Sequence, residues 1–240
     1  MRPMFSYMGS KWRIAKKYGS PQTGLVIEPF AGAACYSLYW NAPKVILYDL
    51  NPIIAGIWQY LIKAKESEIL GLPTDFDSVD DLKISQEAGW LIGFWITKGN
   101  VHPNKSRSAW ARQYRNSGDC KVWGDAVKYR LAKQLSGIRN WKVVCADYKE
   151  CSNVKADWFI DPPYEIAGKH YPFSALNYDE LATFCRGRKG RVTVCENEGA
   201  NWLPFKPFVT ARAMTGKKGI RQSVEVVYQS ELDERIGLAA

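Results

Sequence analysis

The chain has little histidine and no clustered cysteine, and these shortages exclude several kinds of site. Its 240 residues include only two histidines, His102 and His170, and six cysteines without a CxxC pair. Structural zinc sites need clustered Cys and His ligands, so the sequence predicts no metal site. A Ser-His or Cys-His nucleophile is disfavoured for the same reason. We therefore expect chemistry that uses carboxylates, backbone groups and a cofactor.

Long apolar runs are also absent. The longest, residues 89–96, is far shorter than the roughly 20 residues that span a bilayer. The N-terminal segment MRPMFSYMGSKWR lacks the apolar core of a secretory signal. Without such a signal, the cysteines are expected to be reduced and mostly buried. The expectation is a monomeric cytoplasmic protein, bacterial or encoded by a phage in a bacterial host, with no membrane partner.

Acidic residues are scarce in one stretch only. The chain has 33 Lys and Arg against 24 Asp and Glu, a net charge of +9. Residues 98–142 hold 11 of the basic residues and two acids, so they account for the whole excess. Aromatic residues such as Trp110 and Tyr114 alternate with these cations, and bases stack on such rings. The stretch predicts a nucleic-acid-binding face, although a solvated surface has the same composition.

Two short strands, each followed by a helix, begin the chain. Residues 25–29 and 44–48 are apolar and strand-like, and Asn51-Pro52 is a typical helix start. This β-α-β-α order favours a parallel sheet with crossover helices. Further strands are predicted at 141–146, 157–160, 191–195 and 223–228, a helix at 178–186, and a strand at 208–211 that pairs with the last one.

The alternation of strands and helices breaks at Glu66. Residues 66–87 hold seven acids and one lysine, which suggests a linker and short helices, and 124–137 is helix-like. The sequence therefore predicts an α/β domain formed by residues 1–65 and 141–240. A mostly helical insert, residues 66–140, interrupts it and contains almost all of the basic excess.

Two motifs follow the first two predicted strands. The small residues in Glu28-Pro29-Phe30-Ala31-Gly32 would let a ligand approach the backbone, although a structural turn explains them equally well. Asp49-Leu50-Asn51 places an acid where it can accept hydrogen bonds from both ribose hydroxyls. Alone, Asp49 could simply precede a helix cap. Together, in this order, the motifs favour an adenosine-type cofactor.

A third motif, Asp161-Pro162-Pro163-Tyr164, directly follows the strand predicted at 157–160. The prolines lack N–H donors and stiffen the turn, while their carbonyls remain acceptors. Asp161 and the Pro162 carbonyl could each accept one hydrogen of an aromatic amino group while Tyr164 stacks on the ring. Such an amine is a poor nucleophile because its lone pair is delocalised. Accepting both hydrogens favours a pyramidal nitrogen that can attack.

These motifs resemble those of the Dam-like group of DNA adenine-N6 methyltransferases. Tyr7-Met8-Gly9-Ser10-Lys11 is similar to the group's N-terminal cofactor motif, and Glu28-Pro29-Phe30-Ala31-Gly32 to its motif I. Asp49-Leu50-Asn51 resembles motif II, and Asp161-Pro162-Pro163-Tyr164 resembles catalytic motif IV. The order fits as well, with a target-recognition insert between motifs II and IV. One residue departs from the pattern: Ala34 replaces the family's second motif I glycine, and its methyl would crowd the cofactor.

The resemblance implies a Rossmann-like methyltransferase sheet that binds S-adenosylmethionine. Asp49 would hold the ribose hydroxyls, and Asp147 resembles the motif III acid that contacts the adenine, although a strand-end turn has the same pattern. Carried over by position, the cofactor site would comprise Tyr7, Met8, Gly9, Ser10, Lys11, Glu28, Pro29, Phe30, Ala31, Gly32, Asp49, Leu50, Asn51, Asp147, Tyr148 and Asp161.

The implied reaction is methyl transfer to a flipped adenine in double-stranded DNA, site-specific or relaxed in specificity, with no metal. The catalytic residues would be Asp161, Pro162, Pro163 and Tyr164. DNA would be bound by Lys105, Arg107, Arg112, Arg115, Lys121, Lys128 and Arg130.

Three alternatives to this reaction differ in substrate or in activity. An RNA base-amino methyltransferase remains open because some of those enzymes have a similar Asp-Pro-Pro-Tyr turn. A cytosine-N4 enzyme is disfavoured by Asp rather than Ser at position 161, and a cytosine-C5 enzyme by the lack of a Pro-Cys pair. A catalytically silent nucleic-acid-binding protein on the same fold also remains open, with Ala34 as its main support.

Overall fold

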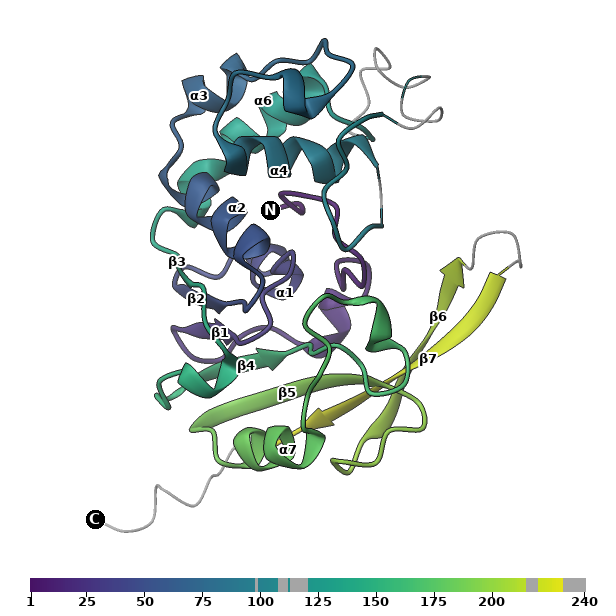
Figure 1. Ribbon diagram of the computed structural model, residues 1–240. Helices are drawn as coiled ribbons and strands as arrows, with labels where there is room; N and C mark the ends of the chain where they lie inside the picture. The colour runs from purple at the N-terminus through teal and green to yellow at the C-terminus, as the bar shows by residue number, and fades with distance from the viewer. Residues whose placement is uncertain (98, 108–111, 113–120, 215–219, 231–240) are drawn as a thin grey trace.

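The computed structural model describes residues 1–97, 99–107, 112, 121–214 and 220–230. Within them, one seven-stranded sheet has the order β3-β2-β1-β4-β5-β7-β6 (Figure 1). Strands β1 to β5 are mutually parallel, and β7 is antiparallel to β5 and β6. The strands are β1 (Val26–Glu28), β2 (Val45–Tyr48), β3 (Lys142–Val144), β4 (Ala156–Ile160), β5 (Gly190–Asn197), β6 (Lys206–Met214) and β7 (Ile220–Gln229). The α/β fold class predicted from the sequence is confirmed.

Local sequence signals determine where helix α2 begins. Asn51 accepts a hydrogen bond from the Ile53 amide at 3.0 Å, and Pro52 opens α2, as predicted. The α-helices are α1 (Cys35–Tyr39), α2 (Pro52–Lys63), α3 (Glu66–Gly71), α4 (Gln86–Ile96), α6 (Asp125–Gln134) and α7 (Tyr178–Arg186), and the short 3₁₀ helices are η1 (Ala15–Tyr18), η2 (Val79–Asp81), η3 (Leu135–Ile138), η4 (Tyr148–Glu150) and η5 (Gly168–His170). Among the described residues, no helix has the length and apolar character to cross a membrane.

Alternate residues of the central strands face opposite sides of the sheet. Val26 and Phe159 belong to the core cluster that contains α2, α4 and α6, whereas Ile27 and Ile160 belong to the cluster beneath α7. This period of two is what a strand buried on both faces requires. Figure 1 shows the two helical layers at opposite sides of the sheet.

The helical segment 66–140 shares the core of the α/β part. A single cluster of buried residues runs from Leu47 in β2 to Leu131 in α6. Trp95 of α4 also donates from its indole N–H to the Met4 carbonyl at 2.8 Å. The packing of the described residues therefore shows no boundary at residue 66 or at residue 140. The division into two domains stays a prediction.

The sheet reverses its strand order between β1 and β4. The chain runs outward from β1 through β2 to β3, then returns to β4 and continues to β5. Val26 pairs with Asp157, so the carboxyl ends of β1 and β4 lie side by side. In open α/β sheets, ligands bind at such a switch point, beyond the carboxyl ends of the strands.

Ala34, the residue that directly precedes α1, has a left-handed conformation, with φ 45° and ψ 44°. A residue with a Cβ pays about 1–2 kcal/mol there, whereas glycine does not. The position that departs from the motif I pattern is thus one at which the backbone itself favours glycine.

We expect Ala34→Gly to raise the free energy of unfolding by about 0.5–1 kcal/mol, because the relief of strain exceeds the extra entropy of glycine in the unfolded chain. Urea unfolding would measure the change. The neighbouring Ala33→Gly is the control and should destabilise, since Ala33 does not have a positive φ. A less stable Ala34→Gly variant would contradict the assignment of strain.

Candidate functional site

A cavity of about 740 Å³ opens at the switch point, within the roughly 300–1,000 Å³ range of small-molecule sites. Its wall combines the N-terminal segment with the turns that follow β1, β2, β3 and β4. All of the catalytic and cofactor residues predicted from the sequence line it: Tyr7, Met8, Gly9, Ser10, Lys11, Glu28, Pro29, Phe30, Ala31, Gly32, Asp49, Leu50, Asn51, Asp147, Tyr148, Asp161, Pro162, Pro163 and Tyr164.

Asp49 joins the turns that follow β1 and β2. Its Oδ2 accepts from the Gly32 amide and its Oδ1 from the Asn51 amide, both at 2.9 Å. Burial raises the pKa of Asp49 to about 6, although the two hydrogen bonds oppose the shift. Each carboxylate oxygen has further lone pairs, so Asp49 can still accept from a ligand.

Glu28 lies at the end of β1 and is almost fully buried. Its Oε1 accepts from the Ser37 amide at 3.0 Å, in the first turn of α1, where Ala34 provides no side-chain cap. Burial raises the pKa of Glu28 to about 8, against the hydrogen bonds from Ser37, with a smaller raising effect from Asp161. The carboxyl is therefore protonated at neutral pH and can donate a hydrogen bond into the cavity.

Glu28→Gln is expected to stabilise the free protein at neutral and alkaline pH. The folded pKa lies above the ordinary value of 4.5, so this group makes the fold less stable as pH rises from about 4.5 to about 8. Glutamine keeps the acceptor but removes that cost, on the order of 4 kcal/mol at pH 8 and near zero below pH 4.5. Urea unfolding across this range would measure it, and a pH-independent difference would contradict the buried neutral carboxyl.

Lys11, Asp161 and Tyr164 meet at the end of β4. Lys11 Nζ lies 3.0 Å from Asp161 Oδ1, donates to the Gly9 carbonyl at 3.0 Å, and lies 4.8 Å from the Tyr164 ring centroid. Burial lowers the pKa of Lys11, but Asp161 and then Glu225 raise it above the ordinary value overall. Lys11 is therefore a buried cation held between carboxylates.

Aromatic rings form the walls on either side of these polar groups. Phe30 stacks on Tyr148 with centroids 5.4 Å apart. Asp147 caps the start of η4 and accepts from the Lys149 amide at 2.9 Å, so it has a structural role as well as a place on the cavity wall. On the opposite side, a Cβ at Gly32 would meet the Tyr7 ring at 3.3 Å, which indicates close packing.

Sequence reasoning missed Tyr171 and Glu225. The Tyr171 hydroxyl donates to the Met8 carbonyl at 3.2 Å, and a Cβ at Gly9 would lie 2.3 Å from that hydroxyl, so a larger residue there would displace the Tyr171 ring. Neither residue belongs to a motif. For Glu225, the available signal was an acid inside an otherwise apolar predicted strand.

Two of the predicted DNA-binding cations are buried. Arg107 is 5% exposed and donates to the Thr74 carbonyl at 2.7 Å. Lys128 is 8% exposed and donates to the Leu70 and Leu72 carbonyls at the end of α3, each at 2.9 Å. Lysine at a helix C-terminus satisfies carbonyls that lack a partner within the helix. These two charges serve the fold, and a phosphate would not reach them.

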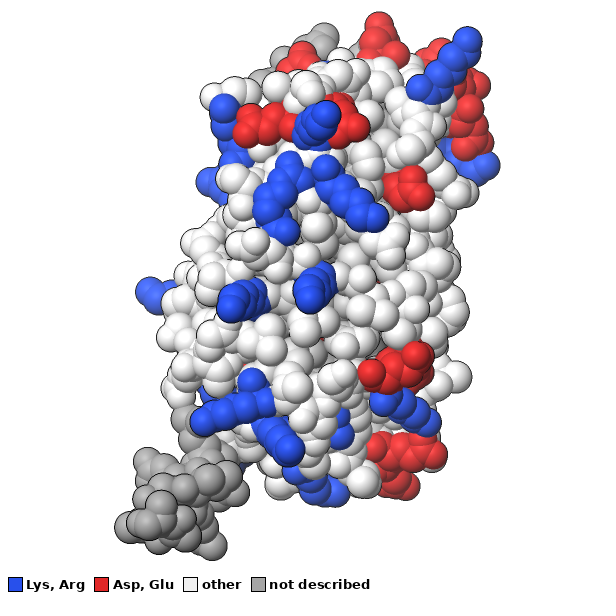
Figure 2. All heavy atoms as spheres, turned by 90° about the vertical axis from the view of Figure 1, so that its left-hand side faces the viewer, with Lys and Arg blue, Asp and Glu red and all other residues white. Residues whose placement is uncertain are grey.

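The remaining predicted DNA-binding cations differ from one another in exposure. Arg130 is half-buried and donates to the Pro3 carbonyl at 3.0 Å. Lys105, Arg112 and Lys121 are exposed, and Arg115 lies outside the described residues. Figure 2 shows Lys and Arg spread along the face that carries the β3 edge of the sheet rather than gathered in one patch.

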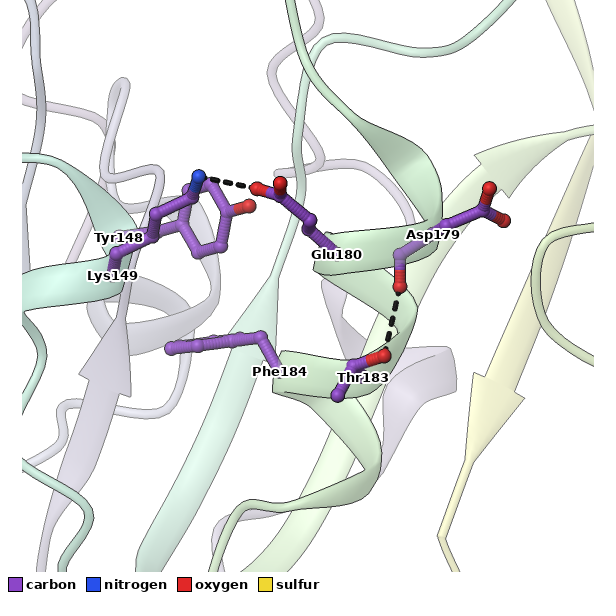
Figure 3. A pocket seen from close by; sticks show the side chains of 6 residues that line it. All are labelled: Tyr148, Lys149, Asp179, Glu180, Thr183 and Phe184. Atoms are coloured by element: carbon purple, nitrogen blue, oxygen red, sulfur yellow. Dashed lines mark hydrogen bonds and ion pairs between the residues drawn. The ribbon is translucent and has the colours of Figure 1, made fainter.

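A second depression, of about 450 Å³, lies between η4 and α7 (Figure 3). Lys149 pairs with Glu180 across it, and Tyr148 meets Phe184 edge to face at 5.0 Å. We assign no ligand to it, because its lysine is already paired. In the part of the chain that the structure describes, no group of three or more His, Cys, Asp or Glu is placed to hold a metal ion.

No protein-family model matches the chain, and no curated protein matches it. Solved structures do align with it. A methyltransferase candidate, yhhF of Escherichia coli, is 12% identical with a TM-score of 0.39, over 87% of this chain and 76% of that one. A methylase candidate from Haemophilus influenzae is 11% identical with a TM-score of 0.35, over 90% and 83%. A conserved hypothetical protein of Streptococcus pyogenes is 11% identical with a TM-score of 0.34, over 86% of each chain. Likenesses this distant do not assign the chain to a family.

Proposed function

We propose that the protein transfers a methyl group from S-adenosylmethionine to the N6 amino group of adenine in double-stranded DNA. The supporting observation is that Asp161-Pro162-Pro163-Tyr164 opens onto the same cavity as Asp49 and Glu28, at the switch point of the sheet. The groups suited to a base, which are Asp161, the Pro162 carbonyl and the Tyr164 ring, thus lie in the same cavity as Asp49, an acid suited to a ribose.

The residues present fit this cofactor. Asp49 would accept hydrogen bonds from the ribose hydroxyls, and the stacked rings of Phe30 and Tyr148 provide an apolar wall for an adenine. Glu28, protonated, would donate toward the amino-acid moiety. When bound, S-adenosylmethionine supplies an electrophilic methyl group on a sulfonium.

The turn after β4 would prepare the amine for attack. Asp161 and the Pro162 carbonyl accept one amino hydrogen each, and Tyr164 stacks on the ring, so positioning and electrostatics provide the rate. The Tyr178 hydroxyl donates to the Pro163 carbonyl at 2.9 Å and fixes the turn from behind. The Lys11 ammonium already donates to Asp161, so an incoming amino group must share or replace that contact.

Such a site would act on a base that has left the duplex, because a stacked base cannot enter a cavity beneath the strand ends. Lys105, Arg112 and Lys121 are exposed on the described surface and would contact phosphates, and Lys105 would exchange its ion pair with Asp80 for one with a phosphate. Arg115 lies beside them in the sequence. A monomer would suffice, because all of the proposed residues come from one chain.

The test is an assay of labelled methyl transfer from S-adenosylmethionine to unmethylated DNA, followed by nucleoside analysis. We expect N6-methyladenine. If the label were transferred to RNA and not to DNA, the protein would be an RNA base-amino methyltransferase instead. Binding of nucleic acid without label in either substrate would identify a catalytically silent binding protein.

A further inference from the structure

The ring of Tyr164 is tied at its far end to β7. Its hydroxyl donates a hydrogen bond of 2.5 Å to Oε2 of Glu225. Glu225 is 9% exposed and stands opposite Asn197, at the carboxyl end of β5. Stacking on a base requires the face of a tyrosine ring but not its hydroxyl, so this buried bond has a purpose that stacking does not explain.

The surroundings keep this hydrogen bond intact. Burial raises the pKa of Tyr164 well above its ordinary value, and Asp161 adds to the shift, so the phenol remains a donor at any physiological pH. Burial also raises the pKa of Glu225, while Lys11 and the hydrogen bond from Tyr164 lower it. Either protonation state of Glu225 leaves an oxygen that accepts.

We propose that Glu225 is a positioning residue that holds the Tyr164 ring in the plane required to stack on the substrate base. The inference rests on the proposed function. A ring attached only through Cβ turns about two side-chain torsions, whereas a second attachment at the hydroxyl fixes both. The strand position matters as well: Val227, two residues along β7, belongs to the core cluster against which Tyr164 packs. A one-residue slip of β7 would turn Glu225 to the other face.

A double-mutant cycle of Tyr164→Phe and Glu225→Ala tests this role. We expect each single change to lower kcat about tenfold with KM for DNA nearly unchanged, because a misplaced ring costs more in the transition state than in binding. The double variant should lose about tenfold, not a hundredfold, since both changes remove one interaction. Glu225→Gln, which still accepts, should stay within about threefold of the wild type. Glu198→Ala, exposed on the turn after β5, is the control.

Urea unfolding of the free protein gives a readout that does not depend on methyl transfer. Each single change should lower the midpoint, and the double change should lower it no further than the larger single one. Additive midpoints, or wild-type kcat in Glu225→Ala, would overturn the positioning role. If the wild type forms no methylated base, the proposed function and the stacking role both fail, while non-additive midpoints would still report the bond.

Discussion

Replacing Asp161 with alanine is expected to lower the rate of methyl transfer by about 10³-fold. The reason is local. Asp161 is the carboxylate of the turn after β4, and its removal leaves the Pro162 carbonyl as a single acceptor for two amino hydrogens. Single-turnover kinetics on unmethylated DNA would measure the rate.

The Asp161→Ala variant should remain folded, because Lys11 keeps its hydrogen bond to the Gly9 carbonyl and the attraction of Glu225. Circular dichroism and urea unfolding would check this. Asp179→Ala, exposed in the first turn of α7, is the matched control and should retain full activity. An Asp161→Ala enzyme with wild-type rate would refute the proposed chemistry.

Asp49→Asn is expected to weaken cofactor binding by about 100-fold, since a hydrogen bond to a charged group contributes roughly 1.5–3 kcal/mol and 1.4 kcal/mol is tenfold. Both Asp49 oxygens already accept from backbone amides, so the asparagine NH₂ would face either the Gly32 or the Asn51 N–H. Isothermal titration calorimetry would measure the affinity.

The pH dependence of cofactor affinity shows whether the negative charge of Asp49 is needed for binding. Its pKa is raised to about 6, so the carboxylate predominates above pH 6 and is lost as pH falls below it. The contribution of Asp49 to wild-type affinity should therefore be nearly constant at pH 7–8 and fall by about tenfold per unit well below pH 6. The asparagine variant should show no such fall. A wild-type affinity that rises on acidification would show that the carboxylate is not the acceptor.

The part of the candidate site that lies at the ends of strands could be predicted from the sequence. Glu28, Asp49 and Asp161 each follow an apolar run that becomes a parallel strand, and the carboxyl ends of such strands meet at one edge. The order of these short segments was therefore enough to place the three acids around one cavity. The start of α2 was equally readable, because Asn51 and Pro52 act through local backbone geometry.

Contacts between residues far apart in the chain could not be predicted from the sequence. The bond between Tyr164 and Glu225 depends on the register of β7, which no local pattern specifies. The burial of Lys128 and Arg107 could not be predicted for a related reason. Long cationic side chains reach either solvent or a helix carbonyl, and Lys128 and Arg107 reach carbonyls. The number of cations in a segment therefore does not show how many of them reach the solvent.

The pairing of Val26 with Asp157 has a consequence for how the chain is made. During synthesis β1 and β2 leave the ribosome early, but β4 follows only after the whole helical segment has been translated. At about 5–20 residues per second, one edge of β1 waits for several seconds without its neighbour. The nascent chain therefore exposes an unpaired, apolar strand edge during that interval, the kind of surface on which chaperones act and aggregation begins. The edge of β1 that borders the proposed site is the last part of this half of the sheet to form.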